Sequence, residues 1–363
     1  MNIEVKTKNN KNYKIFISNN IIDKIQDFVD VNKYSSIAIL TDENLVKNGW
    51  LEKLQKSLSK EVFVIQIQSG EGNKNIKTVL NIWEQMQKAE LDRKSLLINL
   101  GGGVVCDLGG FCASTYMRGI DFLQIPTTLL SQVDASVGGK TGFNLNGVKN
   151  CVGAFVHPIS VIIDTDTLET LPKREYISGF SEVLKYGFIY DKNFHDYLKG
   201  LNVKELSNEE LCKIIKISCE IKAKVVAEDF KEKGVRAILN YGHTLGHSIE
   251  SLSHKMDIPL THGEAVAIGM VGEAYIAKKL RRITNDELLE LENLIAKYGL
   301  PIKYSVQNNN DEIYSMLFKD KKTVNKKINW VLMNKIGGVD FNIEVEENII
   351  KKAINYYLGH KLY

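Results

Sequence analysis

The sequence predicts an α/β protein in two parts: an N-terminal α/β domain in residues 1–170 and a mostly α-helical C-terminal domain in residues 171–363. Three observations support this prediction. Short apolar runs alternate with helical patterns in the first part. After residue 172 glycine becomes sparse and apolar residues recur at spacings of three and four. The length of 363 residues exceeds what one hydrophobic core usually serves.

Buried parallel strands account for the pattern of the first part. Their apolar residues are consecutive, which is typical of strands that are covered on both faces. We predict strands at residues 13–17, 36–40, 62–66, 95–100, 122–126 and 161–164, and a crossover helix at residues 76–89. Residues 131–150 are rich in glycine and amides, so we expect a long polar loop there. Its lysines favour anion binding, and a solvated loop is the alternative.

Glycine-rich segments follow several of these strands. In GGGVVCDLGGF, residues 101–111, glycines allow backbone N–H groups to approach a pyrophosphate, although Cys106 stands where the usual dinucleotide fingerprint has glycine or alanine. SGEGNK, residues 69–74, is either a nucleotide loop or a polar turn. Asp42 ends a strand and either binds a ribose hydroxyl or caps a helix. Together these segments indicate a Rossmann-like nucleotide-binding domain.

Histidines close together in the C-terminal half suggest a metal site. His243 and His247 are four residues apart, so on a helix both leave the same face. His262 lies in a Thr-His-Gly-Glu turn before another apolar helix, on a loop able to fold back. Glu182 interrupts an apolar helix and requires a partner. That partner is either a metal shared with His243 and His262, or Lys185 one helical turn away.

Composition excludes several classes of function. The 47 basic and 44 acidic residues give a net charge of +3, too balanced for a nucleic-acid binder, so an anionic ligand must meet local clusters of Lys and Arg. No apolar run approaches the roughly 18 residues of a membrane span, and the N-terminus lacks the apolar core of a signal peptide. Scattered cysteines without CxxC spacing suit free thiols in a reducing cytoplasm: Cys106, Cys112, Cys151, Cys212 and Cys219.

Five motifs together resemble the 3-dehydroquinate synthase family of the sugar phosphate cyclase superfamily. They are GGGVVCDLGGF, PTTLLSQVDASVGGKTG, GFSEVLKYG, RAILNYGHTLGHSIE and THGEAVAIGM, in the family's order and approximate spacing. The resemblance implies conversion of 3-deoxy-D-arabino-heptulosonate 7-phosphate to 3-dehydroquinate and phosphate, in the shikimate pathway to chorismate and the aromatic amino acids. It implies transient oxidation by bound NAD⁺, phosphate elimination, re-reduction and intramolecular aldol closure. It also implies a divalent metal, Zn²⁺ or Co²⁺, and a cytoplasmic homodimer with its active site between the domains.

The resemblance further implies roles for individual residues. Glu182, His243 and His262 become the metal ligands, and His247 becomes a proton-transfer group beside them rather than a ligand. Residues expected to contact NAD are Asp42, Ser69, Gly70, Glu71, Gly72, Asn73, Lys74, Gly103, Val104, Val105, Cys106, Asp107, Thr127, Thr128, Lys140, Lys149, Thr167, Leu168, Glu169 and Thr170. Residues expected to contact substrate are Arg118 (from the neighbouring subunit), Asp134, Lys140, Asn150, Lys185, Lys222, Arg236, Asn240 and Lys322 or Lys321.

Local departures from the family pattern and rival functions remain open. Cys106 and Val148 replace usual glycines, Phe143 and Leu145 alter the loop after Lys140, and the pair at residues 156–157 is Val-His, which leaves loop conformation and NAD affinity undecided. One rival is another sugar phosphate cyclase, such as a 2-deoxy-scyllo-inosose synthase. A second is a metal-dependent polyol dehydrogenase, which would release NADH. A third is a non-catalytic nucleotide-binding module, but its structural metal would require a fourth protein ligand.

Overall fold

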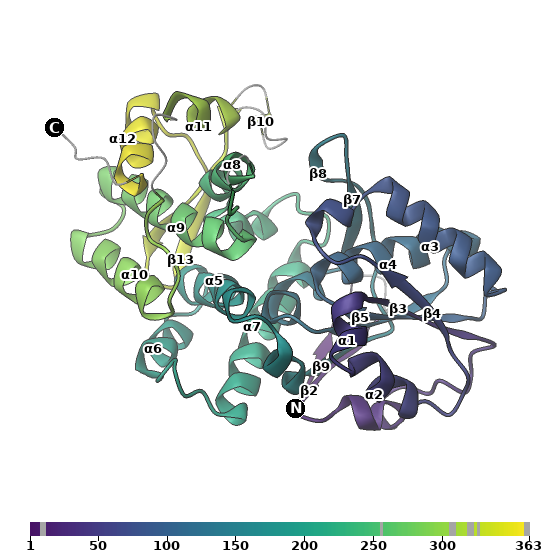
Figure 1. The fold of residues 1–363 in the computed structure, drawn as a ribbon. Coiled ribbons are helices and arrows are strands. Elements are labelled where there is room, and N and C mark those ends of the chain that lie inside the picture. The colour runs from purple at the N-terminus through teal and green to yellow at the C-terminus, as the bar shows by residue number, and fades with distance from the viewer. Residues whose placement is uncertain (8–11, 255–256, 305–309, 318–322, 325–326, 359–363) are drawn as a thin grey trace. The chain divides into compact units, whose positions relative to one another are not determined.

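The computed structural model describes residues 1–7, 12–254, 257–304, 310–317, 323–324 and 327–358. The chain divides into two compact units (Figure 1). The first comprises Met1–Pro172 and Ser207–Ala227, and the second comprises Lys173–Leu206 and Glu228–Tyr363. Among the described residues, no helix is long and apolar enough to cross a membrane.

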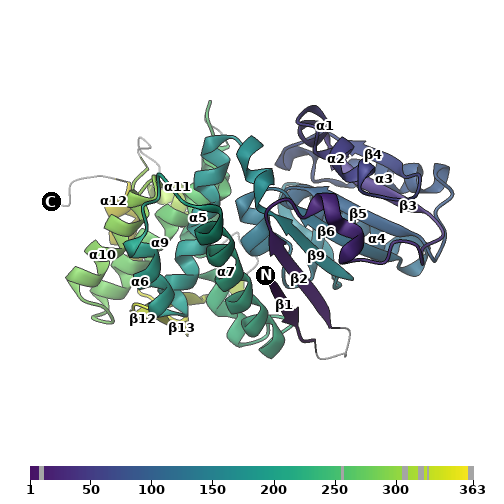
Figure 2. The ribbon, with the colours of Figure 1, turned by 90° about the horizontal axis from the view of Figure 1, so that it is seen from below.

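A seven-stranded sheet forms the centre of the first unit, in the order β1-β2-β9-β6-β5-β3-β4 (Figure 2). Strand β1 pairs with β2 antiparallel, and all the other pairings are parallel. The six predicted strands are confirmed, with small shifts at their ends. The strands are β1 (Asn2–Val5), β2 (Tyr13–Ser18), β3 (Ile37–Asp42), β4 (Phe63–Ile67), β5 (Leu96–Gly101), β6 (Asp121–Pro126) and β9 (Ser160–Asp164).

Both faces of this sheet are covered by helices, as the consecutive apolar runs predicted. Successive residues of β3 point to opposite faces, and Ile39 and Leu40 are both fully buried. On the face of Ile39 lie the 3₁₀ segment η1 (Ile22–Asp27) and α2 (Trp50–Lys56). On the face of Leu40 lie α3 (Ile76–Lys88) and α4 (Gly103–Thr115). This two-sided cover is typical of doubly wound α/β domains.

The prediction of a long polar loop at residues 131–150 is wrong. This segment holds a π-helical turn, Ser131–Ala135, and a hairpin of β7 (Lys140–Leu145) with β8 (Val148–Phe155). Asn146 and Gly147 both have positive φ, 49° and 79°, so this Asn-Gly pair forms the type of turn that favours a hairpin. A Cβ on Gly142 would lie 2.4 Å from the Val152 carbonyl oxygen. The glycines therefore allow close strand pairing instead of marking a loop.

The second unit is mostly helical, as predicted. Helix α9 (His262–Lys279) is its central element and packs against α5, α8, α10 and α12. The other elements are α5 (Lys173–Ile189), α6 (Lys192–Gly200), η6 (Val235–Asn240), α8 (His243–Ser253), α10 (Asn285–Lys297), α11 (Asn310–Leu317), β10 (Thr323–Val324), β11 (Lys327–Ile328), β12 (Trp330–Lys335), β13 (Gly338–Ile343) and α12 (Glu347–Tyr357).

Helix α7 (Asn208–Glu228) departs from the division that we drew at residue 170, because nearly all of it belongs to the first compact unit. Residues 207–227 belong to the first compact unit, although they lie well within residues 171–363. The assignment of residues 1–170 to a cofactor domain and 171–363 to a metal and substrate domain stays a prediction.

Candidate active site

Close backbone contact between α8 and α9 brings two histidines together. A Cβ on Gly269 would lie 2.0 Å from the Gly242 carbonyl oxygen, and a Cβ on Gly246 would lie 3.1 Å from the carbonyl oxygen of Ala265. Only glycine permits this approach at Gly269. His243 and His262 are the first residues of α8 and α9, and their ring centroids are 5.4 Å apart.

Glu182 of α5 faces both of these imidazoles. Its side chain is only 1% exposed, and its Oε1 lies 3.5 Å from His243 Nε2 and 3.9 Å from His262 Nε2. The ligand atoms of the three residues all lie within 4.8 Å of one another. Oε1 has no hydrogen-bond partner within the described parts of the chain, whereas Oε2 forms an ion pair with the ammonium of Lys185. Both alternatives predicted for Glu182 are therefore close to it: the two histidines with which it would share a metal, and Lys185.

The outer nitrogen of each imidazole is held by another group. His243 Nδ1 lies 3.0 Å from the Tyr241 carbonyl oxygen, and His262 Nδ1 lies 3.4 Å from Glu250 Oε2. The Nε2 atoms of both imidazoles face Glu182 Oε1. This arrangement fits a divalent metal, because metal-bound histidines usually donate their second ring N–H to a carboxylate or a carbonyl. Three protein ligands leave a position open, as a catalytic zinc requires.

His247 lies beside both of the other histidines. Its ring centroid lies 5.3 Å from that of His243 and 6.0 Å from that of His262. His247, Glu250 and His262 also form a second group of potential metal ligands. The proton-transfer role of His247 stays a prediction.

Substrate candidates of the second unit lie on or near the segment before α8. Lys185 Nζ donates to the Leu239 carbonyl oxygen at 2.9 Å, Arg236 Nη1 donates to the Phe230 carbonyl oxygen at 2.7 Å, and Asn240 donates to a Glu232 carboxylate oxygen at 2.8 Å. Lys185 and Arg236 are 1% and 2% exposed. Their positive charges are thus built into the same unit as the metal cluster. Lys321 and Lys322 lie outside the described residues.

Lys222 and Asp134 meet in the first unit. From α7, the Lys222 ammonium donates to the carboxylate and to the backbone carbonyl oxygen of Asp134, both at 2.6 Å. Asp134 belongs to the π-helical turn before the hairpin. Two predicted substrate residues that are 88 positions apart in sequence therefore form one ion pair.

A second buried cation joins three of the predicted segments. Lys74 donates at 2.6 Å to Asp107 Oδ2 of α4 and at 2.6 Å to the Asn150 side-chain oxygen of β8. Lys74 is 5% exposed. Burial raises the pKa of the Asp107 carboxyl, and the neighbouring Lys74 charge opposes that rise. The segment at residues 69–74, the glycine run and the hairpin thus converge on one ion pair.

Other cofactor candidates follow the carboxyl ends of parallel strands. Asp42 ends β3, Gly103 follows β5, Thr127 follows β6 and Thr167 follows β9. Ligands of doubly wound sheets bind at this edge. Helix α4 begins at Gly103 with Gly102 as its N-cap, which provides no side-chain hydrogen bond. The first turn of α4 therefore suits an anion.

The observed contacts of these candidates are local. Asp42 accepts hydrogen bonds from the N–H groups of Asn44 and Leu45, so the helix-cap alternative is realised in α1 (Glu43–Lys47). Burial raises the pKa of Asp42. The Cys106 thiol is buried against the Gly101 carbonyl oxygen. The remaining candidates lie in or beside the segments already described: Ser69, Gly70, Glu71, Gly72, Asn73, Val104, Val105, Thr128, Leu168, Glu169 and Thr170.

Lysines and an arginine at the surface complete the predicted set. Lys140 is exposed at the start of β7, and Lys149 is partly exposed in β8. Arg118 is exposed in the short 3₁₀ segment Tyr116–Arg118. Met117 and Arg118 both have positive φ, 51° and 68°, a conformation that side-chain-bearing residues rarely adopt.

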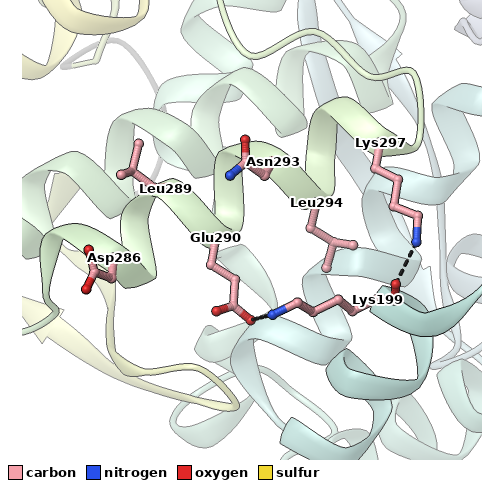
Figure 3. A pocket seen from close by; sticks show the side chains of 7 residues that line it. All are labelled: Lys199, Asp286, Leu289, Glu290, Asn293, Leu294 and Lys297. Carbon is pink, nitrogen blue, oxygen red and sulfur yellow. Dashed lines mark hydrogen bonds and ion pairs between the residues drawn. The ribbon is translucent and has the colours of Figure 1, made fainter.

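A pocket of about 400 Å³ lies elsewhere in the second unit, between α6 and α10 (Figure 3). Two lysines that line it are engaged in contacts within the protein. Lys199 Nζ lies 2.9 Å from Glu290 Oε1, and Lys297 Nζ donates to the Lys199 carbonyl oxygen at 2.6 Å. None of the predicted site residues lines it. These contacts join two helices and indicate a structural role.

Two buried acids of the second unit were missed in the sequence. Glu250 contacts His262, and Glu273 contacts the first turn of α8. Each interrupts an apolar helical run, which is the same signal that drew attention to Glu182. A carboxylate at such a position requires a partner. Applied throughout, this signal would have found both.

Known proteins resemble this chain over nearly its full length. The profile of the 3-dehydroquinate synthase N-terminal region matches residues 64–178, and that of the C-terminal region matches residues 179–323. A 3-dehydroquinate synthase of Thermodesulfovibrio yellowstonii is 44% identical over 309 residues, covering 84% of this chain and 86% of the relative. One of Campylobacter hominis is 39% identical over 351 residues, covering 96% and 98%.

A solved structure has the same fold. It is that of a 2-deoxy-scyllo-inosose synthase complexed with carbaglucose-6-phosphate, NAD⁺ and Co²⁺, with a TM-score of 0.88 over 99% of this chain and 100% of that one. At 24% identity this similarity supports the fold alone. The two matching profiles and the near-full-length relatives carry the assignment, and the chain therefore belongs to the 3-dehydroquinate synthase family.

Proposed function

We propose that this chain converts 3-deoxy-D-arabino-heptulosonate 7-phosphate to 3-dehydroquinate and phosphate, with Glu182, His243 and His262 holding a divalent metal. One observation carries the metal assignment. Oε1 of the buried Glu182 has no hydrogen bond within the described residues and faces the Nε2 atoms of two imidazoles whose Nδ1 atoms are already engaged, while Oε2 is paired with Lys185. A metal ion would provide a partner for Oε1, and a buried polar atom without a partner destabilises the fold.

The chain's own residues would bind and orient the substrate. When bound, the metal polarises a substrate hydroxyl, and NAD⁺ accepts and later returns a hydride. The cations Lys185, Lys222 and Arg236 suit a substrate that carries both a phosphate and a carboxylate. His247, one helical turn after His243, is within reach of the same region and would transfer a proton.

The basic residues also bear on the rival cyclase. The 2-deoxy-scyllo-inosose synthase is complexed with carbaglucose-6-phosphate, a ligand without a carboxylate, whereas Lys222, Arg236 and Asn240 together suit a carboxylate-bearing substrate. NAD⁺ would lie at the carboxyl edge of the sheet, beside Asp42, Gly103 and Thr127. That edge is where dinucleotides bind in this fold class.

We propose, in addition, a homodimer in a reducing cytoplasm. Arg118 would reach the partner's phosphate site. Strained backbone conformations cluster at functional sites, and the positive φ of Met117 and Arg118 supports a role for this turn. All five cysteines are free, which suits a reducing compartment.

The deciding experiment measures phosphate release from the substrate, with and without prior chelation, while NADH absorbance is followed in the same cuvette. We expect stoichiometric phosphate and 3-dehydroquinate, loss of activity on chelation and no lasting NADH. Net NADH from a polyol, with no phosphate release, would instead identify a dehydrogenase. Activity on a different sugar phosphate would point to another cyclase.

A matched pair of variants of helix α5 tests the metal ligand. Glu182→Gln removes the buried charge, and we expect loss of both zinc binding and phosphate release. Glu175→Gln removes an exposed carboxylate of the same helix and should leave both unchanged. Equal zinc affinity in the two variants would refute the assignment of Glu182.

A further inference from the structure

We propose that Glu273 is a positioning residue for the metal site. It lies in the central helix α9, within an apolar run, and is fully buried at 0% exposure. Its carboxylate would hold the first turn of α8, and thereby the His243 imidazole, in place before any metal binds. The inference rests on the proposed metal role of His243.

Glu273 accepts hydrogen bonds from the beginning of α8. Its Oε2 accepts from the Gly242 N–H at 2.7 Å, and its Oε1 accepts from the N–H groups of Thr244 at 3.1 Å and Leu245 at 3.4 Å. These N–H groups belong to the helix end, where donors have no partner within the helix. The partial positive charge of a helix N-terminus also favours a carboxylate there.

The cap must come from another helix because Gly242 cannot supply it. The N-cap of α8 is Gly242, which has φ +79° and no side chain. A Cβ at this position would lie 2.6 Å from Met270 Cγ and 2.9 Å from the Val266 carbonyl oxygen. Serine or aspartate, the usual capping residues, therefore do not fit. Glu273 performs this capping from the neighbouring helix.

The same contacts determine where His243 lies. Tyr241 donates its hydroxyl hydrogen to the Met270 carbonyl oxygen at 3.1 Å, so the residues on both sides of Gly242–His243 are attached to α9. The Tyr241 carbonyl oxygen in turn lies 3.0 Å from His243 Nδ1. Loosening the turn would shift His243 Nε2 away from its 3.5 Å approach to Glu182. Glu273 thus acts through the backbone and not by touching the metal.

The test compares Glu273→Gln with Asp164→Asn in the full-length protein. Asp164 is a matched control, because it is also fully buried and accepts hydrogen bonds at 3.0 Å from the N–H groups of Ile21 and Ile22, in the first unit. Zinc affinity is measured by competition with a chromophoric chelator, and the site geometry by the visible absorption spectrum of the Co²⁺ form. We expect about 10- to 100-fold weaker zinc binding and an altered Co²⁺ spectrum for Glu273→Gln only.

The outcomes separate this inference from the proposed function. If the wild-type protein binds no zinc, the metal site itself fails. If the wild type binds zinc, Glu182→Gln does not, and Glu273→Gln matches the wild type in affinity and spectrum, only the role of Glu273 fails. The intact protein provides a test that needs no variant: the amides of Thr244 and Leu245 should exchange hydrogen slowly with and without zinc. Slow exchange only in the zinc form would overturn the inference.

Discussion

At the residue scale, Lys74 is a buried cation that holds three segments of the first unit together. Its side chain and that of Asp107 are 6% and 19% exposed, so their ion pair is largely removed from water. The Asn150 side chain provides a further acceptor at 2.6 Å. Removing one partner of such a pair leaves an uncompensated buried charge.

We therefore expect Lys74→Met to lower the free energy of unfolding by about 3 kcal/mol, because Asp107 loses its counter-ion. Urea unfolding followed by circular dichroism measures this loss. The double variant Lys74→Met/Asp107→Asn should recover part of it, since the stranded charge is gone. Lys56→Met, which breaks an exposed ion pair with Glu52, is the control and should leave the free energy of unfolding nearly unchanged. Equal losses in the two single variants would contradict the buried-pair account.

At the element scale, the two capping boxes of the second unit form a natural comparison. Thr261 caps α9 and Thr284 caps α10, each paired with a glutamate three residues later. Of these two helices, α9 alone begins with a candidate metal ligand, His262. The same local structure thus occurs once at the metal cluster and once in a helix that contributes no residue to it.

Thr261→Ala and Thr284→Ala should each lower the free energy of unfolding by about 1 kcal/mol, because each removes an N-cap hydrogen bond. Thr261→Ala should also weaken zinc binding, since fraying of the first turn moves His262. Chemical unfolding and chelator competition measure the two effects. The prediction is wrong if both variants bind zinc equally well.

Glu264 links the stability of α9 to pH. Burial tends to raise the pKa of its carboxyl, but hydrogen bonds from Arg174 and from the Thr261 N–H outweigh burial, so the pKa lies below its ordinary value of 4.5. A carboxyl with a lowered pKa stabilises the folded state above its ordinary pKa, and this contribution is lost as the pH falls through the lowered value.

Lowering the pH from about 5 to 3 should therefore destabilise the wild type more than Glu264→Gln, which cannot titrate. Arg174→Met should lie between them, because it removes one of the groups that lower the pKa. Urea titrations at a series of pH values give the free energy of unfolding as a function of pH. If this free energy falls equally steeply in the wild type and in Glu264→Gln, then Glu264 does not contribute to acid destabilisation.

At the scale of the whole molecule, the proposed cofactor and metal residues belong to different compact units. The candidate residues at the carboxyl edge of the sheet lie in the first unit, and Glu182, His243 and His262 lie in the second. Each ligand that binds the folded state stabilises it by an amount set by its concentration relative to its Kd.

NAD⁺ at 100 times its Kd should raise the stability by about 2.7 kcal/mol, and zinc should do the same at its own site. Glu182→Gln should keep the response to NAD⁺ and lose the response to zinc. Thermal unfolding with each ligand alone measures both responses. A variant that lost its NAD⁺ response as well would contradict the assignment of the NAD⁺ and metal residues to different units.

The sequence by itself determined where most strands and helices form and which residue types could make up the candidate site. Consecutive apolar runs predicted the six strands, and spacings of three and four predicted the helical part. These patterns are local, so they can be read along the chain. Glu182 was singled out because a carboxylate in an apolar helix requires a partner, and the histidines because they lie close together in the sequence. The family resemblance chose His243 and His262 over His247 as predicted ligands. The glycine content of residues 131–150 led to a wrong loop prediction, because there glycine allows two strands, β7 and β8, to pair closely.

Only the tertiary structure decided which distant groups meet. It showed that most of α7 belongs to the first unit and that Lys74 binds Asp107 and Asn150. It also showed that Glu250 contacts His262 and that Glu273 accepts a hydrogen bond from Gly242, the residue before His243. The physical reason is that a buried charged group needs a partner, either an opposite charge or a group that donates to an anion or accepts from a cation, and the local sequence does not specify which residue that partner is. Packing of the helices selects that partner, since contacts between residues far apart in sequence exist only once the chain has folded.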